Sequence, residues 1–495
     1  MRSGAFSMLV LLALRGCGAW LSSAGTRIVA TDTLEPVDLK CINWYGAHQQ
    51  GFVVGGLHKR SCGEIADSIV EIDANCVRIP LSVELVVKNP LVNVSLIAGV
   101  NKSECPNSEL TTPRALDVLD CTVGQLTSRG LMVILNIHNS FAGWVGANER
   151  VPQGLWHSER FPTSAWLESL STLALRYRTD SLVVGLDIRN EIHDQDGVVI
   201  TWGKSDNEDW DWKAATMLAD EAIKEINMEI LVIVSGLCRG YDLRAMQDLD
   251  NYRGKFVFTT HIYIFSMWFT HISWSAVLWL SLLFVACNLA AVWWLRKSRF
   301  SVQLYFGMAR SRDKFTYVLA GAVVPSVYLV VVNIIWIEQA TEAGCSSIAE
   351  DAVWSLSIGI VSMSIVLGAW GILAMHENKV CYTRLVTSVC VWNACLGFVQ
   401  ALLSLFYMTP LAVAWDLRRW QSRDIPVWVG EFGTVVGDTS REWGWLLSYV
   451  KEMDFAYWPL NGCMDRFGWI HNDTFGLLDC DWVTMRNVTF TRTIF

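Results

Sequence analysis

Two glutamates, Glu191 and Glu431, end predicted strands in the sequences DIRNE and VGEFG, where their carboxyl groups are suited to glycoside hydrolysis. In the retaining reaction, one protonated carboxyl donates a proton to the leaving oxygen while an ionised carboxylate attacks the anomeric carbon. The two carboxyl groups then lie about 5–5.5 Å apart. We therefore expect Glu191 to act as acid/base and Glu431 to act as nucleophile.

Three polar residues at other strand ends would control the ionisation of these carboxyl groups. Arg78, in VRIP, and Tyr263, in HIY, are expected to keep Glu431 ionised through charge and a hydrogen bond. His261, two residues before Tyr263, would tune Glu191. All three are expected to be catalytic residues.

Sugar recognition would come from a second group of side chains at the strand ends. Asn190 is expected to bind the sugar 2-hydroxyl, and Trp458, in YWPLNG, would stack on the sugar ring. His138, in NIHN, and Asn190 are expected in both the catalytic and the substrate-binding set, and Trp44 in the substrate-binding set. No CxxC pair or other ligand spacing indicates a metal, and no cofactor is expected.

A (β/α)8 barrel would bring these residues together, because the C-terminal ends of its strands form one catalytic face. The expected strands are Leu39–Tyr45, Asn75–Pro80, Leu131–His138, Leu182–Glu191, Glu229–Leu237, Phe256–Tyr263, Pro426–Phe432 and Phe455–Pro459. The expected helices include Cys62–Ile72, Pro113–Arg129, Thr163–Arg178 and Asn207–Asn227. The end of the chain, Cys463–Phe495, is expected to form turns and short extended pieces.

The strand-end motifs resemble glycoside hydrolase family 5, the cellulase family. The motifs are VRIP at 77–80, RNE at 189–191, HIY at 261–263 and GEFG at 430–433, with His138 and Trp458. The resemblance covers roughly 39–265 and 410–480. It implies the barrel, retention of configuration and the same roles for Glu191 and Glu431. The family includes cellulases, mannanases, exoglucanases and glycolipid-cleaving enzymes, so the resemblance does not name a substrate. The isoleucine after Glu191, where the family usually has proline, is a departure.

Four apolar segments without Asp, Glu, Lys or Arg predict an insertion of four transmembrane helices between strands six and seven. They are Ile272–Leu295, Phe315–Ile337, Ala352–Met375 and Leu385–Met408. The basic loops 296–314 and 376–384 are expected in the cytoplasm, and the acidic loop between the second and third segments outside. Because only Ile264–His271 separates Tyr263 from the first segment, the catalytic face is expected to lie close to the membrane.

The N-terminus resembles a secretory signal peptide, with cleavage expected near Ala24. Four sequons predict glycosylation outside the cytoplasm: Asn93, Asn101, Asn472 and Asn487. The expected organisation is a signal peptide at 1–24, barrel strands one to six in 25–265, the insertion at 266–409 and the last strands in 410–495. The expected localisation is an integral protein of the plasma membrane or of a secretory-pathway membrane, with the barrel extracytoplasmic.

Fourteen cysteines are present, nine of them outside the predicted signal peptide, spans and cytoplasmic loops. Disulfides are therefore expected, with at least one of the nine unpaired. The proposed pairs are Cys105 with Cys121 and Cys463 with Cys480. His48, His157 and His193 are expected on loops as polar surface residues.

Composition limits the function. Charged residues are only 18% of the 495, the AVILMFWYC group is 52%, and the net charge is −9. This excludes a disordered or collagen-like chain and a simple soluble cytosolic protein, and disfavours nucleic acid as a partner. The favoured function is a membrane-tethered retaining β-glycosidase acting on a β-glucan or membrane-proximal glycan. The expected partners are thus a carbohydrate or glycolipid substrate and the lipid bilayer. The alternatives are a glycolipid-cleaving β-glycosidase, a catalytically inactive carbohydrate-binding receptor, and a transporter or channel.

Overall fold

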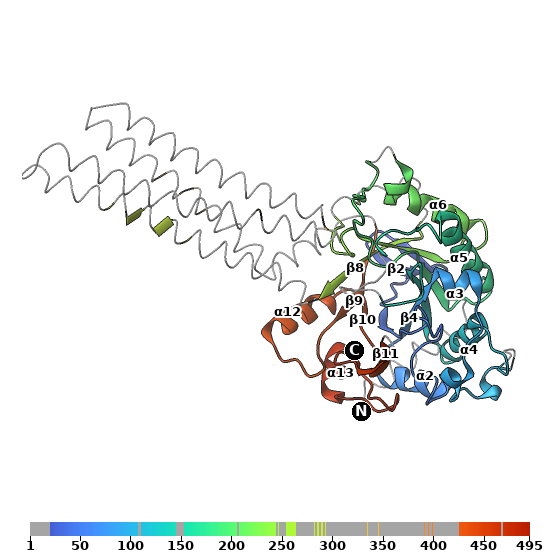
Figure 1. Ribbon diagram of the computed structural model, residues 1–495. Helices are drawn as coiled ribbons and strands as arrows, with labels where there is room; N and C mark the ends of the chain where they lie inside the picture. The colour runs from blue at the N-terminus through green and yellow to red at the C-terminus, as the bar shows by residue number, and fades with distance from the viewer. Residues whose placement is uncertain are drawn as a thin grey trace, which may run out of the picture. The chain divides into compact units, whose positions relative to one another are not determined.

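The computed structural model describes most of the chain outside its middle third (Figure 1). The described ranges are 20–106, 110–144, 153–204, 207–243, 246, 254–263, 425–466 and 469–495, with isolated helical residues between 282 and 398 and residue 345. The chain divides into two units. One comprises Met1–Ile264 with Leu417–Phe495, and the other Phe265–Asp416.

Eight parallel strands close into a barrel in the order β10-β3-β4-β5-β6-β7-β8-β9. The strands are β3 (Lys40–Asn43), β4 (Cys76–Ser82), β5 (Met132–Asn139), β6 (Val183–Asp187), β7 (Leu231–Ser235), β8 (Phe256–Tyr263), β9 (Val427–Gly433) and β10 (Asp454–Tyr457). Each overlaps one of the eight strands predicted from the sequence, and the predicted barrel is confirmed. The strands read as near-continuous apolar runs because both of their faces are covered.

Helices cover the outside of the barrel, as Figure 1 shows for α2 to α6. They are α2 (Cys62–Glu71), α3 (Val83–Lys88), α4 (Ala115–Thr127), α5 (Thr163–Arg176), α6 (Trp212–Lys224), α12 (Arg441–Val450) and α13 (Val488–Ile494). Short 3₁₀ turns are η2 (Val94–Ile97), η3 (Lys102–Glu104) and η4 (Glu208–Trp210). Local sequence sets the boundaries: Ser61 and Glu64 form a capping box at the start of α2, and Asp211 caps α6.

An N-terminal hairpin packs on the barrel and contains the predicted cleavage site at Ala24. Strands β1 (Leu21–Ala24) and β2 (Arg27–Ala30) pair antiparallel. Leu21 is buried in the core cluster that fills the barrel, and its carbonyl accepts a hydrogen bond from Lys255 Nζ at 2.8 Å. Cleavage after Ala24 would remove this strand, and the boundary at Ala24 stays a prediction. The preceding residues 1–19 lie outside the described part.

The C-terminal segment contains more regular structure than the sequence suggested. A hairpin of β11 (Cys463–Arg466) and β12 (Trp469–Asn472) follows the last barrel strand, and the chain ends in α13. Asn487 caps this helix by accepting from the Phe490 N–H at 2.9 Å. The sequence showed no clear periodicity here because seven helical residues are too few to establish one.

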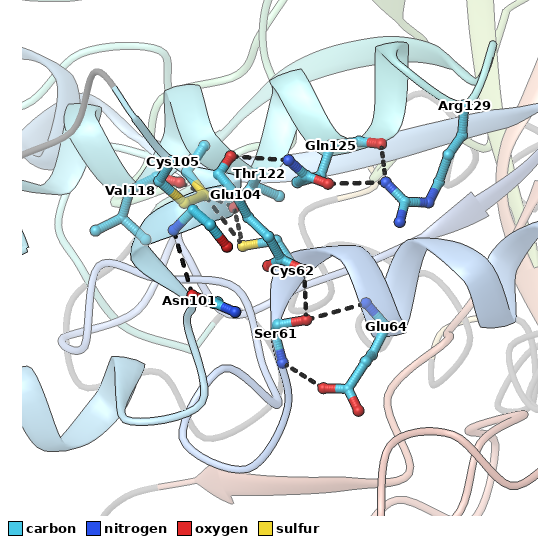
Figure 2. Close-up of a disulfide and its surroundings, with 12 residues drawn as sticks. Ser61, Cys62, Glu64, Asn101, Glu104, Cys105, Val118, Thr122, Gln125 and Arg129 are labelled. Atoms are coloured by element: carbon cyan, nitrogen blue, oxygen red, sulfur yellow. Dashed lines mark hydrogen bonds between the residues drawn. A yellow bond between two sulfur atoms is a disulfide. The ribbon is translucent and has the colours of Figure 1, made fainter.

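Three disulfides are described, and two of them are the predicted pairs Cys105–Cys121 and Cys463–Cys480. The third joins Cys41 and Cys76, which are directly paired across β3 and β4. Cys238 and Cys345 are also disulfide-bonded. Cys62 is a free, buried thiol 3.7 Å from Cys121 Sγ (Figure 2), and burial raises the pKa of the Cys62 thiol to about 12. The expectation of an unpaired cysteine outside the apolar segments is confirmed.

The membrane prediction is not supported. Among the residues that the structure describes, no helix is both long enough and apolar enough to cross a bilayer. This finding contradicts the predicted localisation as an integral membrane protein and leaves the bilayer and glycolipid partners without support. The four apolar segments, apart from isolated residues, lie outside the described residues, as does the linker Ile264–His271 after Tyr263.

Candidate active site

Arg78 organises the buried floor of the barrel mouth. Its Nη1 donates to Glu431 Oε1 at 2.7 Å, and its Nε and Nη2 lie 2.9 and 2.8 Å from Asp187 Oδ2. The same guanidinium donates to the side-chain oxygens of Asn43 and Asn190 at 2.9 and 2.8 Å. Burial opposes the positive charge, but Asp187 and Glu431 outweigh it and raise the pKa of Arg78. Arg78 is therefore a fixed cation beneath Glu431.

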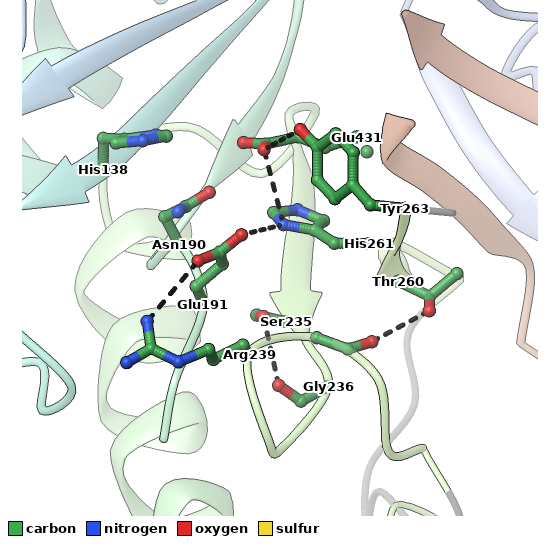
Figure 3. A network of polar contacts seen from close by, with 12 residues as sticks. His138, Asn190, Glu191, Ser235, Gly236, Arg239, Thr260, His261, Tyr263 and Glu431 are labelled. Carbon is green, nitrogen blue, oxygen red and sulfur yellow. Dashed lines mark hydrogen bonds and ion pairs between the residues drawn. The ribbon is translucent and has the colours of Figure 1, made fainter. Parts of the chain in front are cut away.

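Tyr263 completes the environment of Glu431. Its hydroxyl donates to Glu431 Oε2 at 2.8 Å (Figure 3). Each carboxylate oxygen therefore accepts from a different residue, because Arg78 donates to Oε1. Burial, and then the charges of Glu431 and Glu191, raise the pKa of Tyr263 well above its usual value. The phenol therefore stays protonated and can keep donating. Both predicted partners of Glu431 are present.

The glycines around Glu431 are required by close packing. A Cβ at Gly430 would come within 2.3 Å of Thr259 Oγ1, and one at Gly433 within 2.2 Å of the Trp458 carbonyl oxygen. The GEFG sequence thus lets β9 lie against both of its neighbours while Glu431 points into the mouth.

Glu191 lies on a bend rather than on a strand, because β6 ends at Asp187. Its φ is +43°, a left-handed conformation that is uncommon outside glycine and is often found at functional sites. Its Oε1 is hydrogen-bonded to His261 Nδ1 at 3.1 Å, and its Oε2 lies 3.9 Å from Arg239 Nη1 (Figure 3). Burial acts to raise the pKa of Glu191, but the hydrogen bond and charge of His261, and then the charge of Arg239, outweigh it and lower that pKa.

His261 lies between the two carboxyl groups. Its Nδ1 is 3.1 Å from Glu191 Oε1 and 3.8 Å from Glu431 Oε2. One atom from each of the three residues falls within 4.8 Å of the others, a set that also has the donor types of a metal site. Arg78 and Tyr263 already occupy the Glu431 oxygens, and a cation there would face the guanidinium. The arrangement fits a proton-transfer pair better than a metal centre.

An aromatic wall with two histidines lies beside these carboxyl groups. Trp458 stacks on Tyr45, with ring centroids 4.9 Å apart and an interplanar angle of 6°, and on His138 at 5.8 Å and 14°. His48 packs against His138 at 4.5 Å. Burial, and then the charge of Arg78, lower the pKa of His48 to about 3. Burial, and then the neighbouring His48 and Arg78, lower the pKa of His138 well below its usual value, so both rings are neutral at neutral pH.

Three sequence predictions fail in and around the site. Trp44 is fully buried and donates its indole N–H to the Gly55 carbonyl at 2.9 Å, so it cannot stack on a sugar. Side chains alternate along an extended chain, and here Asn43 and Tyr45 contact the site while Trp44 points away. His48 and His193 are buried rather than on the surface, whereas His157 is partly exposed as expected.

Asp187, Asn43 and Tyr45 are site residues that the sequence analysis missed. Asp187 sits four residues before Glu191 in LDIRNE, and a second acid in that strand-end motif was the available signal. Asn43 supports the floor by donating its amide N–H to the Gly430 carbonyl at 3.1 Å. Tyr45 is fixed by its hydroxyl, which donates to Asp473 Oδ2 at 2.5 Å.

The predicted glycosylation sites differ in their surroundings. Asn93, Asn101 and Asn472 are exposed, and Asn487 is half-buried. Asn93 and Asn101 each accept a backbone N–H two residues on through Oδ1, and Asn487 caps α13. Asn93, Asn101 and Asn472 are therefore more accessible than Asn487.

Part of the chain is similar in sequence to known glycosyl hydrolases. Residues 41–277 match the family model described as Cellulase (glycosyl hydrolase family 5). An endoglucanase of Paenibacillus polymyxa is 28% identical over 196 residues, which is 40% of this chain and 45% of the relative. A glycosyl hydrolase 5 family protein of Chamaecyparis obtusa is 28% identical over 272 residues, 52% of this chain and 47% of the relative. The chain thus spans less than half the length of these relatives.

Solved structures support the same fold. The catalytic domain of the major endoglucanase from Xanthomonas campestris superposes with a TM-score of 0.53 at 18% identity, covering 96% of this chain and 99% of that one. An endocellulase from Pyrococcus horikoshii gives a TM-score of 0.52, also at 18% identity, covering 97% and 98%. Motifs, fold and family model agree, and residues 41–277 are similar to the cellulase family, glycosyl hydrolase family 5.

Proposed function

We propose that the chain hydrolyses a β-glucan by a retaining double displacement, with Glu431 as nucleophile and Glu191 as acid/base. The observation that carries this proposal is the spacing of the two carboxyl groups, whose oxygens come within 4.8 Å of each other around His261. Retaining enzymes hold their carboxyl groups about 5–5.5 Å apart, whereas inverting enzymes need about 6.5–9.5 Å to admit a water. The spacing therefore favours retention.

The first chemical step forms a covalent intermediate. A Glu431 oxygen bonds to the anomeric carbon as the bond from that carbon to the leaving oxygen breaks, and Glu191 transfers its proton to that oxygen. Arg78 and Tyr263 each donate a hydrogen bond to one oxygen of the attacking Glu431 carboxylate and orient it. Because the ester that forms is neutral, the negative charge next to Glu191 disappears during this step.

The second step releases the sugar. Glu191, now a carboxylate, accepts a proton from water, the water oxygen bonds to the anomeric carbon, and the ester to Glu431 breaks. This step restores both carboxyl groups to their starting protonation states.

A neutral glucan suits the rest of the site. Two neutral imidazoles and a stacked Trp458 offer hydrogen-bonding and ring-stacking surfaces without charge. Among the relatives, several are named endoglucanases, which favours an internal bond of the polymer as the target. Sugar binding without hydrolysis does not require two carboxyl groups at this spacing, so the spacing favours a hydrolase over an inactive binding protein.

Trapping the intermediate tests the proposal. A 2-fluoro-cellobioside inactivator should label the peptide that contains Glu431, and E431Q should lose activity by several orders of magnitude. E191A should slow cello-oligosaccharides far more than aryl cellobiosides with good leaving groups, because only the former need the proton. E442Q, an exposed glutamate in the first turn of α12, is the matched control and should behave as wild type. Labelling at another residue, or wild-type activity of E431Q, contradicts the assignment.

A further inference from the structure

A strained bend after β7 lies against the acid/base. Cys238 and Arg239 have φ values of +52° and +57°, and Gly240 follows at +86°, so three successive residues are left-handed. Only glycine adopts this conformation without steric cost, and such strain persists where surrounding contacts hold it. Cys238, the first of the three, is disulfide-bonded.

The bend contacts both elements that carry the proton-transfer groups. The Arg239 N–H donates to the Ile192 carbonyl at 2.8 Å, next to Glu191, and Thr260 Oγ1 donates to the Gly240 carbonyl at 2.8 Å, next to His261. A Cβ at Gly240 would lie 3.1–3.3 Å from the backbone nitrogen, Cγ and Cβ of His261. A bulkier residue at position 240 would therefore push the bend away from β8.

We propose that Arg239 is a positioning residue for Glu191. Its positive charge attracts Glu191 Oε2, the carboxyl oxygen that is not hydrogen-bonded to His261. Arg239 Nη1 lies 3.9 Å from Glu191 Oε2, and His261 Nδ1 lies 3.1 Å from Oε1 (Figure 3). At 3.9 Å the contact is an ion pair rather than a direct hydrogen bond. The inference rests on the proposed function, because it assigns a task to a partner of the acid/base.

The other charged and titratable groups around Glu191 are neutral or contact other carboxyl oxygens, so Arg239 is the cation that faces Glu191 Oε2. Arg78, on β4, is committed to Asp187 and Glu431. His261, on β8, also faces Glu431 on β9, at 3.8 Å. His193, on the Glu191 loop, bonds through Nδ1 to the Glu191 backbone carbonyl, and burial, and then Arg239, lower its pKa to about 4, so that it is neutral.

The consequence is a site that favours the ionised form of Glu191 in the resting enzyme. Glycosyl transfer to Glu431 needs Glu191 protonated, so activity should fall as pH rises through the pKa of Glu191. A positive charge nearby stabilises the carboxylate and moves that fall to lower pH. Removing the charge of Arg239 should move the alkaline limb of the pH profile upward.

The test compares pH profiles of kcat/KM on a cello-oligosaccharide for R239M, R239Q and R239K. The alkaline limb should move up by roughly 0.5–1 pH unit in R239M and R239Q, the effect of one charge about 4 Å away in partly aqueous surroundings. R239K should stay near wild type. The matched control is R27M, which removes the same charge from an exposed ion pair of 3.8 Å with Asp38 on the N-terminal hairpin and should leave the limb in place.

Each result decides the proposal. An unmoved limb in the neutral variants, even with a uniform loss of rate, overturns it and leaves Arg239 a structural residue. If neither neutral variant folds, the same pH profile is measured for the wild type with added NaCl. Salt screens the partly exposed pair of Arg239 and Glu191 and should move the alkaline limb upward. No movement overturns the proposal. Wild-type activity of E191A on the oligosaccharide would instead refute the proposed function itself.

Discussion

Replacing Arg78 by methionine should destabilise the protein far more than removing an equally short ion pair at the surface. The guanidinium is fully buried and contacts Asp187 at 2.8 Å and Glu431 at 2.7 Å, with side-chain exposures of 0% and 5% for the two acids. Breaking a buried pair by removing one partner typically costs about 3–5 kcal/mol, because the remaining charge is uncompensated. R78M leaves two such carboxylates, so we expect at least the upper part of that range at pH 7.

Urea unfolding at several pH values is the assay. Burial raises the pKa of Asp187 even with Arg78 present, so a protonated, neutral Asp187 is the form that the interior tolerates. When the folded-state pKa lies above the unfolded one, the folded protein binds more protons, and stability falls as pH rises through that range. The loss in R78M should therefore be smaller at acidic pH, and R78M/D187N should recover part of it at pH 7.

The matched control is R176M. Arg176 contacts both Asp120 oxygens at 2.6 Å, but its side chain is 29% exposed and that of Asp120 is 39% exposed. A surface pair of this kind contributes about 0–1 kcal/mol. Equal losses in R78M and R176M, or no recovery on adding D187N, would refute the argument that burial decides the cost.

Two further predictions concern the hairpin and the aromatic wall. L21A should lower the free energy of unfolding by about 2–4 kcal/mol in a thermal or urea melt. L34A is the control, because Leu34 is 66% exposed, and should change that free energy little. Equal losses would show that β1 is not part of the core. W458A should raise the KM for cello-oligosaccharides by roughly 10-fold, whereas W44F should lower the melting temperature and leave KM unchanged. A raised KM in W44F would restore Trp44 to the binding set.

The barrel could be predicted from the sequence because its strands are apolar on both faces and end in polar motifs. A run such as FVFTTHIY marks both the strand and the point where chemistry starts, and the predicted Phe256–Tyr263 has the same bounds as β8. The hairpin of β1 and β2 was missed for a physical reason. Its apolar residues follow directly on an apolar leader-like stretch, and four-residue strands have no period that separates them from it.

The site was predictable where a side chain belongs to a strand end and unpredictable where a turn places it. Glu431, His261 and Tyr263 lie on β9 and β8, and their partners followed from the barrel geometry. His48 reaches His138 only because the chain reverses at Gly46, whose φ of +134° and close approach to the Gly55 nitrogen exclude a side chain. No periodicity in the sequence reports such a turn, so His48 was wrongly placed on the surface.

The two carboxyl groups differ in environment as their tasks require. The Glu431 side chain is 5% exposed and contacts Arg78, which is 0% exposed, so its counter-charge is buried. The Glu191 side chain is 19% exposed and faces Arg239, which is 30% exposed. In the proposed mechanism, Glu431 must be ionised whenever it attacks, whereas Glu191 loses and regains a proton in every turnover. A nucleophile benefits from a buried counter-charge that keeps its full strength. A group that exchanges protons with substrate and water benefits from a counter-charge that solvent partly screens.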